Sequence, residues 1–358
     1  FQMFRDFLIS INFIQSKVEP CVFTKEKLII AIFVDDTLST GPANDIQEFR
    51  KALHEKFRIS KDGGKCKQFL SINMDQGKYG IKLCQNQYLE EKLEMFKDFI
   101  HENPNYQVAS PLLPNFQATL LQAETYNDIA SNFPYREMVG SLGYLANGTR
   151  FDISAALSIV SRFCNNPKQL HCEMVRRIYQ YLRGNRKYLF FSYNMPLDMR
   201  GFCDSSHGNL EDYTSLAGYC FKIGDSMITW KAYKSEVTTL STAESEYVAL
   251  TPAVQESIWL QQLLQDLGYK QDTPVIYEDN KPCISLTKNP QERSRTRHIQ
   301  IKYHWVREQF KNGVFKIEYI PSRLQDADIF TKGLHGPRIR DICSKLYLCI
   351  DSEKKGDN

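Results

Sequence analysis

Hydrophobic and polar residues are arranged along the chain in patterns that change at Leu197. Before it, short apolar runs predict two β-hairpins, 27–34 with 37–40 and 68–74 with 79–84. Apolar residues at three- and four-residue spacing predict helices at 45–57, 87–96, 135–163 and 168–183. After Leu197, strands are predicted at 199–203, 216–223, 227–231, 275–278 and 315–320, and helices at 242–267, 282–288, 297–311 and 327–332. The order βββαβααβα in this half predicts an α/β fold.

Composition and the positions of prolines divide the chain into four predicted segments. The stretch from 101 to 132 is polar and contains Pro104, Pro111 and Pro114, which is typical of a linker or a long loop. The predicted segments are 1–106, 107–197 (a linker and helical connection), 198–335 and 336–358 (a C-terminal tail). The chain begins with Phe1 and shows no signal-peptide pattern, so we expect it to be a piece of a longer protein.

Charge and cysteine usage exclude several classes of protein. Lys and Arg number 45 against 42 Asp and Glu, so the chain is no histone-like binder, and nucleic-acid contacts must come from local basic patches. The 10 cysteines form no CxxC pair, which indicates reduced thiols of an intracellular protein, cytoplasmic or nuclear. Since no run of about 18 apolar residues occurs, we expect no membrane span.

Four acidic residues of the second half stand where predicted strands end or helices begin: Asp204, Glu246, Asp279 and Asp328. Such positions are rigid and can point side chains at one spot. Four carboxylates gathered there would repel one another unless divalent cations neutralised them, and oxygen ligands suit Mg²⁺ or Mn²⁺. Two such ions can carry out in-line phosphodiester hydrolysis. For each acid taken singly, a solvated side chain or a helix cap is the alternative.

The motifs that hold these acids resemble a known family. "GFCDSSHGN", "TTLSTAESEYVAL", "VIYEDNKPCISL" and "IEYIPSRLQDADIFTK" resemble the ribonuclease H domain of Pol polyproteins from copia-type LTR retrotransposons, and "FVDDTLSTG" resembles the aspartate motif of their reverse transcriptase. The resemblance implies an α/β chain: an α+β partial polymerase palm and thumb-like region at 1–106, then a ribonuclease H-like domain at 198–335 with a five-stranded mixed sheet flanked by helices.

The resemblance also implies roles for the acidic residues. Asp204, Glu246, Asp279 and Asp328 would hold Mg²⁺ or Mn²⁺ and cut the RNA strand of an RNA/DNA hybrid. Asp35 and Asp36, at the tip of the first predicted hairpin, would hold the metals of the polymerase. In the family their third carboxylate lies upstream of this hairpin, so we expect the polymerase site to be incomplete without an upstream Pol region.

The motif "STAESEY" contains two glutamates and requires a choice. Ser241 and Glu244 have the spacing of a capping box, which gives Glu244 a structural role at the helix start. Glu246 precedes "YVAL", as the metal-binding glutamate of ribonucleases H precedes an apolar residue and then alanine. We therefore assign Glu246 to the metal.

Basic residues near the acids are candidates for binding the hybrid. The predicted phosphate contacts are Lys231, Lys234, Arg293, Arg295, Arg297 and Lys302, although a solvated face is the plainer interpretation. A second basic patch precedes the nuclease: Arg176, Arg177, Arg183, Arg186 and Lys187. The loop "PSRLQ" lacks the histidine that many cellular ribonucleases H carry there. His298 and His304 could approach the site or simply be capped and packed residues.

Three functional hypotheses follow from the sequence. The first is an active ribonuclease H with an incomplete reverse transcriptase, whose partners are the RNA/DNA hybrid and either the upstream Pol region or a second copy of the chain. The second is a catalytically idle remnant that acts as a nucleic-acid-binding or interaction module. The third, an integrase or transposase, is disfavoured because Glu246 precedes the fourth predicted strand instead of following it.

Overall fold

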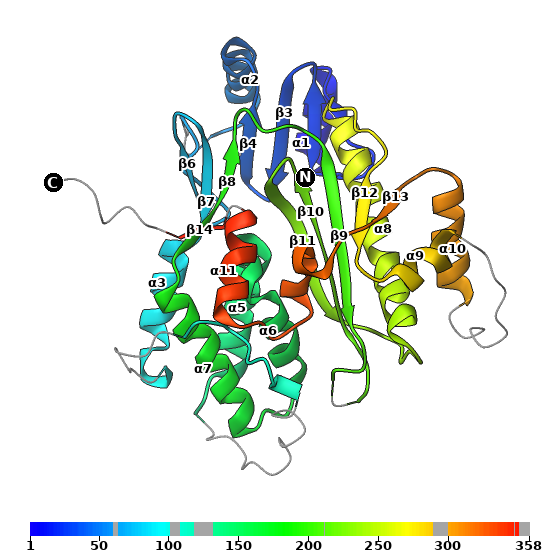
Figure 1. Cartoon of the computed structure of the whole chain (residues 1–358). Helices are drawn as coiled ribbons and strands as arrows, with labels where there is room; N and C mark the ends of the chain where they lie inside the picture. The colour runs from blue at the N-terminus through cyan, green and yellow to red at the C-terminus, as the bar shows by residue number, and fades with distance from the viewer. Residues whose placement is uncertain are drawn as a thin grey trace. The chain divides into compact units, whose positions relative to one another are not determined.

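The structure is a computed structural model that describes residues 1–59, 64–100, 108–117, 132–210, 212–288, 300–346 and 348–350 (Figure 1). It divides into two compact units. The first consists of residues 1–70 and 256–272, and the second of residues 71–255 and 273–358. The domain boundaries expected from the sequence stay a prediction.

The first unit is a small antiparallel sheet with helices. Its elements are α1 (Gln2–Ser10), β1 (Ile14–Gln15), β2 (Val22–Lys25), β3 (Leu28–Phe33), β4 (Asp36–Thr40), α2 (Ala43–Lys56) and β5 (Gln68–Phe69). The four strands β1 to β4 are neighbours in chain order. Alternate residues of β3 are buried, Leu28, Ile30 and Ile32, because successive side chains of a strand point to opposite faces. Strands β3 and β4 pair in antiparallel orientation, so the predicted hairpin at 27–40 is present.

The second unit begins with strands and helices that precede the nuclease motifs. They are β6 (Ile72–Gln76), β7 (Gly80–Cys84), α3 (Asn86–Met95), η1 (Lys97–Phe99), α5 (Tyr135–Gly148), η3 (Phe151–Ile153), α6 (Ser154–Val160), η4 (Ser161–Phe163), α7 (Gln169–Gly184) and β8 (Lys187–Ser192). Strand β8 pairs with β7 and with β14 (Leu348–Ile350). The sequence did not predict β8, and the helix predicted at 135–163 is wrong as a single element: it ends at Gly148, and shorter helices follow.

The nuclease motifs lie on a five-stranded mixed sheet, as predicted. Its strands are β9 (Met199–Ser206), β10 (Leu216–Ile223), β11 (Ser226–Lys234), β12 (Val275–Glu278) and β13 (Lys316–Tyr319), in the order β11-β10-β9-β12-β13. Strands β9 to β11 are antiparallel, whereas β9, β12 and β13 are parallel. The helices that follow are α8 (Thr242–Asp266), α9 (Lys281–Lys288), α10 (Gln300–Lys311), η6 (Ser322–Leu324), η7 (Asp326–Phe330) and α11 (Gly336–Lys345). The segment predicted as an α-helix at 327–332 is thus mostly a 3₁₀ helix.

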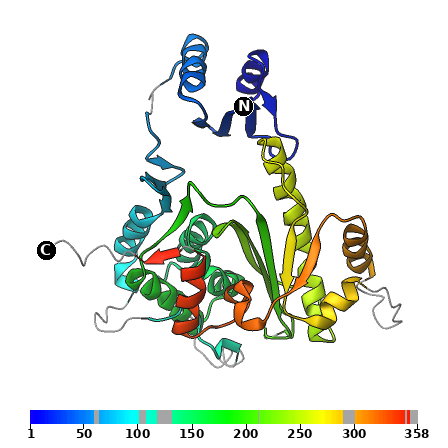
Figure 2. The same cartoon turned by 45° about the horizontal axis from the view of Figure 1, so that its top comes forward.

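Helices cover both faces of this sheet (Figure 2). On one face, Phe202 of β9 and Cys220 of β10 belong to a core with Phe330 of η7 and Ile339 of α11. On the other face, the hydroxyl of Tyr233 donates a hydrogen bond to the carbonyl of Ala249 in α8. The sheet is therefore buried on both sides, which keeps its central strands rigid.

The helical connection is part of this core. The indole N–H of Trp230 in β11 donates to the carbonyl of Ala146 in α5 at 2.8 Å, and the ring of Phe151 lies 5.8 Å from that of Trp230. Val108, Leu112 and Phe116, which fall within the predicted linker, are buried among the helices of the connection. The described part of the linker is thus packed.

A buried charge network ties β8 to the connection. The carboxylate of Asp152 accepts two hydrogen bonds at 2.9 Å from Arg150, one at 2.7 Å from Tyr181 and one at 3.0 Å from Lys187. Burial alone would raise the pKa of Asp152, but Arg150 and Lys187 outweigh it and hold the pKa well below its usual range. Lys187 is 2% exposed, so its place in the predicted second basic patch was wrong.

Replacing Asp152 with asparagine is expected to lower the free energy of unfolding by about 3–5 kcal/mol, because two cations would stay buried without their carboxylate. Urea unfolding followed by circular dichroism measures this loss. Asp341→Asn is the matched control: Asp341 also pairs with two cations, but its side chain is 47% exposed, so we expect a loss of at most about 1 kcal/mol. Equal losses would contradict the structural role of the network.

Within the described residues, none of the helices is long and apolar enough to cross a membrane.

Candidate metal centre

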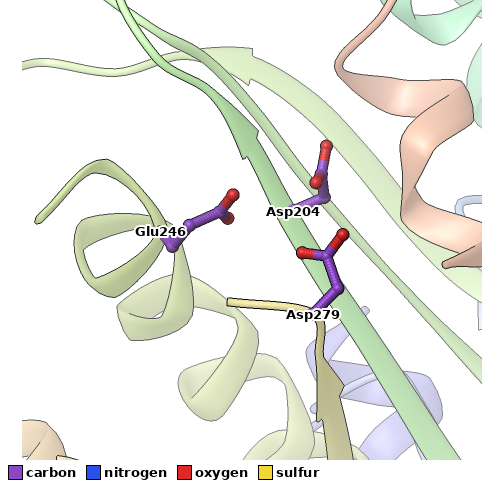
Figure 3. A group of neighbouring side chains, drawn as sticks. All are labelled: Asp204, Glu246 and Asp279. Carbon is purple, nitrogen blue, oxygen red and sulfur yellow. The ribbon is translucent and has the colours of Figure 1, made fainter. Parts of the chain in front are cut away.

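Three of the predicted acids meet at one place. Asp204 comes from β9, Glu246 from α8 and Asp279 from the residue that follows β12, and Figure 3 shows their carboxylates gathered together. One oxygen of each carboxylate lies within 4.8 Å of one oxygen of each other carboxylate. Asp204 and Glu246 are buried, and Asp279 is half-buried. In the described part of the chain, this is the one group of three or more acidic, His or Cys side chains that could share an ion.

The sheet fixes two of the three acids. Asp204 lies inside β9, opposite Gly218 of β10, because the strand continues to Ser206 rather than ending at Asp204 as predicted. Strand β12 pairs in parallel with β9 up to Tyr277, so Asp279 leaves the end of β12 beside Asp204. Adjacent parallel strands thus present both carboxylates at one edge.

The start of α8 positions the third acid. The side chain of Ser241 accepts a hydrogen bond from the N–H of Glu244, and Glu244 accepts one from the N–H of Leu240. Glu244 is thereby engaged at the helix start, and Glu246, half a turn later, faces Asp204. The buried hydroxyl of Ser245 contacts the hydroxyls of Ser205 (2.5 Å) and Ser215 (2.8 Å), which fastens this turn of α8 to β9 and to the residue before β10.

Glu278 is a fourth buried acid, and the sequence interpretation missed it. It is 0% exposed, and its Oε1 accepts a hydrogen bond from the N–H of Asn280 at 3.0 Å. Successive side chains along β12 point to opposite faces, so choosing Asp279 as a metal ligand excluded the adjacent Glu278 from the predicted site. The signal was the adjacent pair of acids in "YEDN".

The electrostatics of the centre favour proton or cation binding. Burial raises the pKa of Asp204 to about 6; Lys332 and Thr331 oppose the rise, whereas Asp328 and Asp279 add to it. Burial, and then the charges of Asp204 and Glu278, raise the pKa of Glu246 well above its usual value. Burial also raises the pKa of Glu278. These carboxylates are therefore costly to ionise together without a counter-ion.

The donor set fits Mg²⁺ or Mn²⁺. The three converging groups are carboxylates, the oxygen ligands that these hard ions prefer. One oxygen of Glu246 and one of Glu278 are buried and have no hydrogen-bond partner among the described residues. A buried, unpartnered carboxylate oxygen is costly, and a cation held by the three converging acids would satisfy that of Glu246.

The structure does not bring Asp328 into this group. Asp328 accepts hydrogen bonds from Lys332, four residues later, and from Nη2 of Arg338 in α11 at 3.2 Å. Lys332 also binds Asp204, 3.1 Å from Nζ to Oδ1, so it lies between the two acids. Asp328 is therefore neutralised by two basic side chains. The sequence interpretation missed Lys332, although the spacing of four residues from Asp328 is one that pairs an acid with a base.

The polymerase aspartates lie in the first unit and are exposed. Asp35 occupies the turn between β3 and β4, and Asp36 begins β4 opposite Phe33. Val34, before them, has a φ of 53°, in the left-handed region. Among the described residues, Asp35 and Asp36 belong to no group of three acids that could share an ion.

The predicted nucleic-acid contacts are placed only in part. Lys231 is exposed on β11, and Lys234 pairs with Asp212. Arg293, Arg295, Arg297 and His298 lie outside the described residues, and the side chain of Lys302 in α10 is also outside them. His304 is an exposed residue of α10.

The strand order β11-β10-β9-β12-β13, with acids inside β9, directly after β12 and on helix α8, defines a ribonuclease H-like fold with an acidic centre.

Comparisons with known proteins extend this classification. The family model described as "Reverse transcriptase (RNA-dependent DNA polymerase)" matches residues 1–114. The "Retrovirus-related Pol polyprotein from transposon TNT 1-94" of Nicotiana tabacum is 32% identical over 97% of this chain and 26% of that polyprotein. The "Putative transposon Ty5-1 protein YCL074W" of Saccharomyces cerevisiae is 31% identical over 64% of this chain and 73% of that protein. Among solved structures, LC11-RNase H1 in complex with an RNA/DNA hybrid is 11% identical, with a TM-score of 0.29 over 37% of this chain and 94% of that one.

The chain belongs to the family of Pol polyproteins from copia-type LTR retrotransposons, as the resemblance predicted. It spans about a quarter of the length of the first polyprotein named above. The ribonuclease H-like class is assigned from the strand order and the three converging acids of this chain alone.

Proposed function

We propose that this chain hydrolyses the RNA strand of RNA/DNA hybrids with Mg²⁺ or Mn²⁺ held by Asp204, Glu246 and Asp279. The observation that carries the proposal is the convergence of these three carboxylates within 4.8 Å on a ribonuclease H-like sheet. When bound, the ions would supply the activation of a water molecule and the stabilisation of the leaving oxygen in phosphodiester hydrolysis.

The residues of the chain would act by holding charge and geometry. Asp204 and Glu246, both buried, would keep their carboxylates fixed and shielded from solvent. Asp279, half-buried at the end of β12, would stand at the opening toward the scissile phosphate. Exposed Lys231, and Lys234 once released from Asp212, would contact phosphates, since a hybrid is recognised by its shape, phosphates and 2′-hydroxyls.

The experiment that tests the proposal compares substrates. The chain is incubated with an RNA/DNA hybrid, a DNA duplex of matching sequence and the single RNA strand, each with Mg²⁺, with Mn²⁺ and with a chelator. We expect metal-dependent cleavage of the RNA in the hybrid and no cleavage of the DNA duplex. Cleavage that the chelator does not abolish would contradict a metal-dependent mechanism.

We expect no polymerase activity from this chain alone. Asp35 and Asp36 are exposed, and no third acid joins them among the described residues. Purified chain with primer, template and Mg²⁺ should not extend the primer, and an added upstream Pol fragment would be required. Primer extension by the chain unaided would contradict this prediction. The double variant Asp35→Asn, Asp36→Asn should cut hybrids at the wild-type rate, which separates the two activities.

A further inference from the structure

Lys332 contacts two acids that the sequence assigned to metal binding. Its ammonium group binds Asp204 Oδ1 at 3.1 Å and also donates to Asp328 Oδ1. The hydroxyl of Thr331, the preceding residue, donates to the other oxygen of Asp204. Both oxygens of Asp204 are thus engaged by one short segment after η7.

The ammonium of Lys332 can break its contact with Asp328 without leaving that carboxylate unpaired. The second oxygen of Asp328 is held by Arg338 at 3.2 Å, so Asp328 keeps a cationic partner from α11. The side chain of Lys332 is 37% exposed, whereas that of Asp204 is 1% exposed. The ammonium therefore reaches the buried carboxylate from the solvent side, on a flexible four-carbon stem.

We propose, on the basis of the function proposed above, that Lys332 is an internal cation of the metal centre. Its ammonium holds Asp204 and Asp328 together while one divalent ion is bound, and a second divalent ion enters by displacing it. Lys332 is then a positioning residue that sets the affinity of the second ion.

Electrostatic repulsion explains why Lys332 would weaken the binding of the second ion. An ammonium and a divalent ion repel each other with an energy that falls only as the inverse of their distance, and this repulsion is strong in a partly buried site. A second ion that uses Asp204 must also break the ion pair with Lys332. The unpartnered buried oxygen of Glu246 remains for the first ion, since no lysine or arginine binds it among the described residues. The two ions are thus bound unequally.

The test is a calorimetric titration of the full chain with MnCl₂ in the absence of nucleic acid. Lys332→Met removes the ammonium and keeps most of the apolar stem. We expect it to bind the weaker Mn²⁺ ion at least tenfold more tightly than the wild type. Lys332→Arg retains the positive charge and should keep the wild-type affinity; it also shows that a change at this position alone is tolerated.

Lys345→Met is the matched control. Lys345 is 38% exposed and pairs with Asp341 of the same helix rather than with one of the three acids, so its loss should leave Mn²⁺ affinity unchanged. If Lys332→Met is poorly folded, Lys332→Gln is titrated instead, with the same expectation. An affinity for the weaker ion that is unchanged or lower in the folded variant overturns the proposal.

These outcomes separate the inference from the proposed function. A wild-type chain that cuts hybrids, together with a Lys332→Met variant that gains no Mn²⁺ affinity, rejects the role of Lys332 alone. A chain that binds Mn²⁺ as expected but does not cut hybrids rejects the proposed activity and leaves the role of Lys332 in place.

Discussion

Asp279→Asn is expected to lower the rate of hybrid cleavage by on the order of a hundredfold or more. Asparagine keeps the shape of the side chain but removes a negative charge from the group of three carboxylates, and with it a ligand for the ion that offsets charge in the transition state. Because Asp279 is half-buried and follows the end of β12, the substitution should not disturb the sheet. Single-turnover cleavage of a labelled hybrid measures the rate.

Glu244→Gln is the control for this experiment. Glu244 accepts a hydrogen bond from the N–H of Leu240, and glutamine can accept the same bond. The variant should therefore cut hybrids at close to the wild-type rate. A loss equal to that of Asp279→Asn would mean that Glu244, rather than Glu246, serves the metal.

Asp204→Asn is expected to stabilise the metal-free protein while abolishing its activity. The pKa of Asp204 is raised to about 6 by burial, against about 3.9 in an unfolded chain, so ionised Asp204 costs stability. Asparagine removes that cost, and the free energy of unfolding in a chelator at neutral pH should rise by about 1–3 kcal/mol. With saturating Mg²⁺ the order should reverse, because only the wild type gains stability from the ion.

The pH dependence follows from the sign of the shift. A carboxyl group with a raised pKa in the folded state contributes its stability below the unfolded pKa and loses it as the pH rises through the folded value. The stability difference between Asp204→Asn and the wild type should thus be small below about pH 4 and reach its plateau above about pH 6. Asp225→Asn, an exposed aspartate of the same unit, should change stability by less than about 0.5 kcal/mol at any pH. A wild type more stable than Asp204→Asn in the chelator would contradict the account.

The sequence predicted the parts of the fold that depend on local periodicity. Strands β9 to β13 and helix α8 follow from short apolar or alternating runs and from helical spacing. Strand β8 was missed because two basic residues, Arg186 and Lys187, precede its apolar run, and the buried Lys187 is paired with Asp152, 35 residues earlier. The apolar run in "YLFF" was the available signal.

In the candidate site, too, local features were predictable from the sequence and long-range contacts were not. Asp204, Glu246 and Asp279 were predicted to converge, and the structure brings them together, because strand β9, the end of β12 and the start of α8 fix their directions. The surroundings of Asp328 depend on Arg338, which lies on another helix, and on how Lys332 is shared with Asp204. Such long-range pairing of charges cannot be read from spacing along one chain.

The most direct test of the central claim is the analysis of products from one hybrid substrate. The folded wild-type chain, shown to bind Mn²⁺, is incubated with a hybrid whose RNA strand is labelled at one end, beside the Asp204→Asn variant. We predict metal-dependent cuts in the RNA by the wild type alone, without a cyclic phosphate at the ends, because the nucleophile is water rather than the 2′-hydroxyl. No cleavage by the wild type, or equal cleavage by the variant, would contradict the account, and absence of cleavage with retained hybrid binding would favour an idle nucleic-acid-binding remnant.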